Sequence, residues 1–149
     1  MRLAHGVWAL VLGLSLASTQ IVLAAESRGP EEVLRALVQA NAEMDLSTMS
    51  KLMAHDEDAV GYTLGGRKYL GWTQLAKDME EEFASVARLD IPITHMRVWT
   101  RGDIAWFAME LDYVRYVRSG EQLSRTVLHL RETGVLERRN GIWLLVAWH

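Results

Sequence analysis

The last apolar segment of the chain ends on a histidine, a residue that can do acid–base chemistry. The final ten residues read NGIWLLVAWH, a turn signal followed by an apolar run that stops at Trp148 and His149. If Asn140-Gly141 is a two-residue hairpin loop, Glu132 lies directly across from His149. A carboxylate with apolar neighbours and an imidazole beside it alter each other's titration. We therefore predict a Glu132–His149 pair, either a catalytic acid–base pair or a structural hydrogen bond at the end of a sheet.

A second turn aligns the first strand of this hairpin with the strand before it. If Ser119-Gly120 is also a two-residue loop, Arg118 pairs with Glu121, and the apolar side chains of both strands share one face. Such a face is expected beneath helices, around a pocket that holds a small, mainly apolar ligand. The predicted ligand-binding residues are Tyr62, Trp72, Phe107, Met109, Leu130, Gly134 and Leu145.

The opposite face of the same strands carries tryptophans among charged side chains. A sheet face that simply meets water does not usually display several indoles. Aromatic residues together with arginine are typical of protein interfaces, so we predict sheet-to-sheet homodimerisation through this face. The alternative is that loops or the N-terminal tail cover it. The predicted interface residues are Trp99, Trp106, Arg131 and Trp148.

The residue pattern gives little support to metal or cofactor chemistry. His95, Glu110 and His129 share the tryptophan-bearing face, but the chain has no close-spaced pair of metal ligands there. The segment GYTLGG has neither the spacing nor the lysine of a phosphate-binding loop. We therefore expect no metal and no cofactor.

Three helices and a set of long strands are predicted to position these faces. Gly29-Pro30-Glu31-Glu32 is typical of a helix start, and Asp45 ends that helix and caps a short second one. Apolar residues spaced by three or four predict a third helix at about residues 72–87. Strands are predicted at about 59–64, 91–100, 104–118, 121–139 and 142–149. The predicted fold is α+β, with three N-terminal helices packed on a strongly curved antiparallel sheet around a cone-shaped hollow.

The first residues of the chain are predicted to be a signal peptide. Arg2 precedes an apolar run that reaches Leu23, and Val22 and Ala24 fit a small-residue cleavage site. We expect a signal peptide over residues 1–24, one domain over 25–149, and a periplasmic or secreted location. An uncleaved membrane anchor is the alternative. The chain has no cysteine, which excludes thiol chemistry, and its net charge of −3 argues against a nucleic-acid partner.

The order of elements and several short motifs resemble the nuclear transport factor 2-like superfamily, in its SnoaL-like branch. The resemblance covers nearly all of residues 30–149 and implies the cone-shaped α+β fold. It does not specify an activity, because this fold hosts isomerases, dehydratases, polyketide cyclases and assembly domains. The matching residues are Gly102-Asp103, Ala105-Trp106, Arg131-x-Thr133-x-Val135-Leu136, Asn140-Gly141, and Trp143 followed six residues later by His149.

The functional residues of two relatives do not carry over from this resemblance. Thr63 stands where ketosteroid isomerase has its base, and Leu37 stands near its helix-one tyrosine. Kinase association domains have an arginine where this chain has Gly134. Three functions remain open: a module that binds a small molecule, a cofactor-independent lyase or isomerase, or an assembly domain. In the enzyme, His149 would abstract a proton while Glu132 holds its tautomer.

Overall fold

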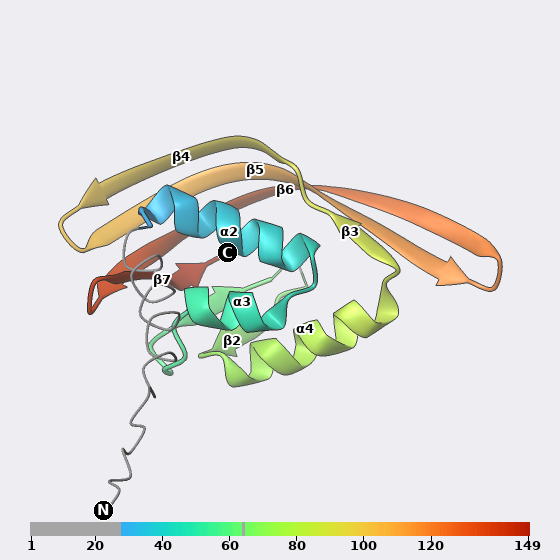
Figure 1. Ribbon diagram of the computed structural model, residues 1–149, viewed down its shortest axis with the longest axis horizontal. Helices are drawn as coiled ribbons and strands as arrows, with labels where there is room; N and C mark the ends of the chain where they lie inside the picture. The colour runs from blue at the N-terminus through green and yellow to red at the C-terminus, as the bar shows by residue number, and fades with distance from the viewer. Residues whose placement is uncertain (1–27, 64) are drawn as a thin grey trace, which may run out of the picture.

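The computed structural model describes residues 28–63 and 65–149, so the predicted signal peptide lies outside the described residues. The helices are α2 (Pro30–Ala42), α3 (Leu46–Leu52) and α4 (Thr73–Ser85). The strands are β1 (Val60–Tyr62), β2 (Lys68–Leu70), β3 (Arg88–Asp90), β4 (Ile93–Arg101), β5 (Ile104–Ser119), β6 (Gln122–Arg139) and β7 (Ile142–Trp148). The sheet curls over the helices, and the hairpin of β5 and β6 projects beyond them (Figure 1).

The helices begin where the sequence predicts. Pro30 occupies the first turn of α2, and the backbone N–H of Gly29 donates to the Glu32 carboxylate over 2.8 Å. Asp45 caps α3 by accepting a hydrogen bond from the Thr48 N–H at 3.0 Å. These caps satisfy backbone donors that a helix start leaves without partners. None of the helices within the described residues is long and apolar enough to cross a membrane.

The sheet is mixed, with the order β2-β1-β7-β6-β5-β3 and β4 paired to β5. Most neighbours are antiparallel, as predicted, but β1 runs parallel to β7. The strands β2 and β3 have three residues each and were not predicted. Strands this short contain too few residues for an alternating pattern to be distinguished from a loop.

The core lies between the concave face of the sheet and the helices. Its largest fully buried side chains come from α2 and from three neighbouring strands. They are Val33, Leu34, Phe107, Leu136 and Leu145. An α+β architecture with three helices on a curved sheet is therefore confirmed.

Two of the hairpin turns decide which side chains face the helices. Asn140 and Gly141 both have positive φ, at 52° and 85°, and Arg139 pairs with Ile142 as predicted. The β5–β6 turn is Gly120-Glu121 instead of Ser119-Gly120, because Ser119 pairs with Gln122. That difference moves every partner along β6 by two residues. Since side chains alternate with a period of two, the predicted faces of β5 and β6 survive.

An irregularity in β7 has the opposite effect. Leu136 pairs with Leu145, but the next pair is Val135 with Ala147, which leaves Val146 without a partner. This is a β-bulge, in which one extra residue reverses the faces of all residues beyond it. Only the last residues of β7 and His149 follow the bulge.

Candidate functional site

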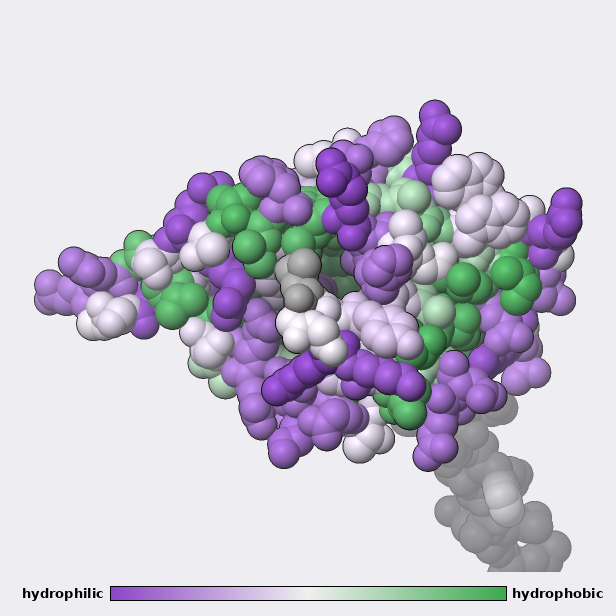
Figure 2. Space-filling view, turned by 180° about the vertical axis from the view of Figure 1, so that it is seen from behind, coloured by the Kyte–Doolittle hydropathy of each residue, from purple (hydrophilic) through white to green (hydrophobic). Residues whose placement is uncertain are grey.

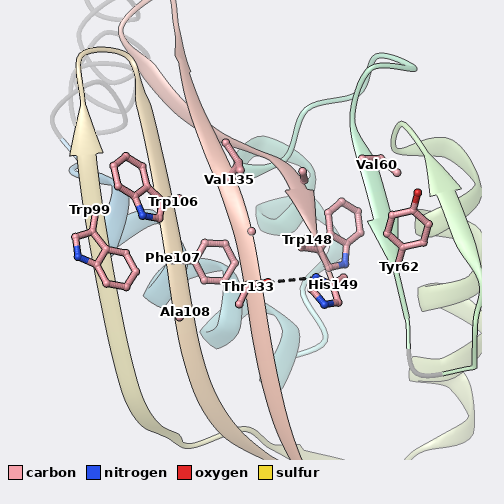
Figure 3. Close-up of a pocket in the computed structure, with 12 residues that line it drawn as sticks. Val60, Tyr62, Trp99, Trp106, Phe107, Ala108, Thr133, Val135, Trp148 and His149 are labelled. Atoms are coloured by element: carbon pink, nitrogen blue, oxygen red, sulfur yellow. Dashed lines mark hydrogen bonds between the residues drawn. The ribbon is translucent and has the colours of Figure 1, made fainter.

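The predicted pairing of Glu132 with His149 is wrong. Beyond the bulge, His149 lies across from Thr133, and the two backbones exchange hydrogen bonds of 2.9 Å in both directions. The His149 Nδ1 also lies 3.2 Å from the Thr133 hydroxyl (Figure 3). Glu132 is the neighbour of Thr133 on β6, so its side chain points to the other face of the sheet. The extra residue Val146 is the physical cause of the error.

The bulge exchanges the positions of the last two side chains. Trp148 pairs with Gly134, and Gly134 pairs with the buried Phe107. Paired residues share a face of the sheet, so the indole of Trp148 turns toward the helices. A Cβ atom on Gly61 would lie 2.1 Å from this indole ring, which means that Trp148 lies directly over Gly61. The predicted outward orientation of Trp148 is therefore wrong. Trp148 as a residue lines cavities on both sides of the sheet.

A cavity of about 120 Å³ lies between the helices and the sheet. Its wall is almost wholly apolar and draws on all three helices and three strands. An engineered apolar cavity of about 150 Å³ holds one benzene molecule, so a single small ring sets the scale of a ligand here. The lining residues are Leu34, Leu37, Val38, Asn41, Met49, Met53, Leu75, Met79, Met109, Glu132, Leu145 and Trp148.

Glu132 is the one ionisable side chain among the described residues that line this cavity. It lies opposite Met109 on β5, and the residue as a whole is half-buried. Burial of its carboxyl group raises its pKa from 4.5 to about 7, with no contribution from a hydrogen bond or a nearby charge. The carboxyl group is therefore distributed between its protonated and ionised forms near neutral pH.

Asn41 is the second polar residue of the cavity. It follows Leu34, Leu37 and Val38 on the inward face of α2. Its Oδ1 atom is buried and accepts no hydrogen bond from any described residue. Buried polar atoms are normally hydrogen-bonded, so an unpaired one in a cavity wall points to an absent partner. Sequence reasoning missed Asn41, although an amide inside an apolar helical stripe is a readable signal.

Five of the seven predicted ligand-binding residues line one of two sites. Met109 and Leu145 line the inner cavity, and Leu130 packs on the core nearby. Trp72 packs on the core beside the start of α4 and stacks on His55, with their ring centres 5.6 Å apart. The other three predicted residues, Tyr62, Phe107 and Gly134, border a groove on the outer face of the sheet.

This outer groove has a volume of about 530 Å³ and is lined largely by aromatic and small residues. Trp99 and Trp106 stack with their ring centres 6.1 Å apart, and about two fifths of each side chain is exposed. Figure 3 shows both indoles on one side of the groove, with Tyr62 and His149 on the other. From behind, the surface is hollowed near its centre, and hydrophobic and polar side chains share the rim (Figure 2).

Charged side chains continue along the same outer face. Arg131 lies 3.8 Å from Glu110, and the His129 Nδ1 lies 2.6 Å from an Asp112 carboxylate oxygen. Within residues 28–63 and 65–149, no cluster of three or more histidine, aspartate or glutamate side chains is arranged to hold a metal ion. The outer face therefore combines exposed indoles with paired charges, which suits contact with another surface.

The comparisons with known proteins identify the family. The SnoaL-like domain model matches residues 31–149. The chain belongs to the SnoaL-like domain family. A comparison with curated proteins finds no match.

Solved structures confirm that this SnoaL-like domain has the nuclear transport factor 2-like fold. A proposed dehydratase of that family from Streptomyces avermitilis is 16% identical, with a TM-score of 0.70 over 89% of this chain and 93% of the other. A superfamily member from Salmonella enterica is 15% identical, with a TM-score of 0.69 over 89% and 91%. The association domain of CaMKII from C. elegans is 19% identical, with a TM-score of 0.58 over 89% and 94%. At these identities the likeness concerns the fold alone.

Proposed function

We propose that this SnoaL-like domain is an exported protein that binds a small, mainly apolar molecule in its inner cavity. The observation that carries the proposal is the composition of the cavity wall. Ten of its twelve residues are apolar, and the remaining two, Asn41 and Glu132, present polar groups without partners among the described residues. Pockets for small ligands combine an apolar wall with a few polar groups that fix orientation.

Binding of neutral single-ring molecules tests this proposal. Toluene, phenol and benzyl alcohol are expected to shift amide resonances of α2, α4 and β6 in two-dimensional NMR, with a Kd of about 1 mM or tighter for the best of them. A Kd of 1 mM corresponds to only about −4 kcal/mol, which is within the reach of a ligand with about eight heavy atoms.

A variant that fills the cavity supplies the control for this binding. Met79 lines the cavity from α4, whereas Lys77 on the same helix is exposed. Met79→Trp should therefore abolish the shifts, because the larger side chain takes the space of the ligand. Lys77→Trp adds the same indole outside the cavity and should leave them intact. If no neutral ring binds, or if both variants bind equally well, the cavity is not the binding site.

A second candidate function is a cofactor-independent lyase or isomerase that uses Glu132 alone. The observation that favours it is the pKa of about 7, because a general base works best when its pKa lies near the operating pH. His149 faces the other side of the sheet, so the predicted two-residue mechanism does not apply. The rate of such an enzyme would rise with pH through about 7, and Glu132→Gln would abolish turnover while retaining the fold.

We also propose that the outer face forms a homodimer. Support comes from the exposed Trp99–Trp106 stack and from the charge pairs beside it. Trp99→Arg combined with Trp106→Arg is expected to convert a dimer to a soluble monomer in analytical ultracentrifugation. Leu123→Arg changes a more exposed apolar residue near the β5–β6 turn, at the opposite end of these strands from the tryptophan stack, and should leave the dimer unchanged. A monomeric wild type would remove this proposal.

A further inference from the structure

We infer that the cavity selects a small apolar amine, bound as its ammonium cation between Glu132, Asn41 and Trp148. The inference rests on the proposed binding function and names the chemical class of the ligand. The buried Asn41 Oδ1 and the ionised Glu132 carboxylate both accept hydrogen bonds, and an ammonium group is the compact donor that matches these two acceptors.

The first step concerns the two acceptors. The Asn41 Oδ1 is buried and receives no hydrogen bond from a described residue. Glu132 lines the same cavity, and no described cation lies close enough to affect its titration. A ligand hydroxyl supplies one donor, whereas an ammonium group supplies three. The ammonium group also carries the positive charge that a buried carboxylate needs as its counter-ion. Leaving such a carboxylate unpaired is costly, so a cation gains more here than a neutral group does.

The second step concerns the remaining wall. Trp148 borders the cavity, and the face of an indole attracts a cation within about 6 Å of the ring centre. Four methionines, namely Met49, Met53, Met79 and Met109, also line the cavity. Their thioethers are weak acceptors and adapt to irregular apolar shapes. Within the described residues the wall holds no arginine, lysine or histidine that would repel a cation or attract an anion.

The third step concerns size. A volume of about 120 Å³ is below the about 150 Å³ that holds one benzene molecule, so it limits the ligand to a single small ring or a short branched chain that itself carries the ammonium group. The ligand class is therefore a primary amine with a compact apolar body. An acid of the same size is disfavoured, because its carboxylate would face Glu132 without a counter-ion.

Three matched probes test the inference on the full-length wild-type protein: benzylamine, benzyl alcohol and benzoate. They share one ring and differ in charge. At pH 8, where Glu132 is mainly ionised, benzylamine is expected to bind at least tenfold more tightly than benzyl alcohol, and benzoate is expected not to bind, as measured by NMR titration. Between pH 8 and pH 5.5 the preference for benzylamine over benzyl alcohol should fall, because Glu132 takes up a proton.

Variants then assign the preference to named groups. Glu132→Gln keeps the size of the side chain and should reduce the tenfold preference to about one, while benzyl alcohol still binds. Asn41→Leu removes the second acceptor and should reduce the preference by several fold without touching the carboxylate. The Asn41 variant also provides a test if the Glu132 variant fails to fold.

The outcomes separate this inference from the proposed function. If benzyl alcohol binds as tightly as benzylamine to the wild type, the amine inference is overturned and the binding function stands. If benzoate binds most tightly, the amine inference is also overturned. If none of the three probes binds and neutral rings fail as well, both proposals fall together.

Discussion

Gly134→Ala is expected to lower the free energy of unfolding by about 3 kcal/mol, because β6 has no room for a side chain at this position. A Cβ atom there would lie 2.2 Å from the backbone oxygen of Ala147 and 2.6 Å from the Phe107 ring. The oxygen belongs to the neighbouring strand, and Phe107 is almost fully buried. Neither can move without disturbing the β6–β7 ladder or the core. Thermal unfolding followed by circular dichroism should show a Tm about 10 °C below that of the wild type.

Gly65→Ala provides the matched control for this prediction. A Cβ atom on Gly65 would meet nothing within 4 Å, and its φ is not in the left-handed region. The Tm of this variant should stay within about 2 °C of the wild type. A Gly134→Ala variant that melts as late as the Gly65 control would show that Phe107 and Ala147 do not approach β6 as closely as described.

Gly134 shapes the inner face of the sheet because it has no side chain. The Phe107 ring from β5 lies over the strand at this position, 2.6 Å from where a Cβ atom would lie. The polar character of the cavity comes from Glu132 and Asn41.

The fold and the positions before the bulge were predictable because their signals are local. Pro30 and Asp45 define helix starts, and Asn140-Gly141 requires positive φ at two successive residues. Glu132 was placed on the inner face despite a misplaced β5–β6 turn. Moving that turn by one residue changes cross-strand partners by two and keeps every face.

The positions of Trp148 and His149 were not predictable, because the bulge before them has no local signal. The segment Leu145-Val146-Ala147 carries no glycine or other sign of a bulge, and a continuous ladder is the natural reading of its apolar run. The bulge depends on contacts that are distant in sequence. The Ala54 N–H donates to the Leu145 carbonyl over 2.9 Å, and Val60 pairs with Ala147, so the second edge of β7 is occupied on both sides of Val146.

Glu132→Gln is expected to stabilise the protein at pH 8 by up to about 3 kcal/mol. Burial raises the pKa of Glu132 from 4.5 to about 7. Between these values the folded state holds a proton that the unfolded state has released, so the free energy of unfolding falls as the pH rises through this window. The loss is complete above about pH 7. Glutamine does not ionise, and the variant should not show this fall.

Urea denaturation at pH 5 and pH 8 measures the effect. The variant and the wild type should differ by less than about 1 kcal/mol at pH 5, and the gap should widen at pH 8. Three other carboxyl groups do not interfere. A hydrogen bond from Thr48 lowers the pKa of Asp45 below 3.8. Hydrogen bonds from Arg139 and from Tyr69 do the same for the pKa values of Asp56 and Asp78. Stability that depends on them is lost only as the pH falls below about 4.

Glu121→Gln is the control for this test. Glu121 lies exposed in the β5–β6 turn, so the substitution removes the same charge outside the cavity. Its stability should follow the wild type at both pH values. An equal gap at pH 5 and pH 8 for the Glu132 variant would show that its carboxyl group is not buried in the folded state. A gap that widens as expected means that the fold retains a carboxyl group at a cost to its own stability. Groups that lower stability in this way are characteristic of sites for binding or catalysis.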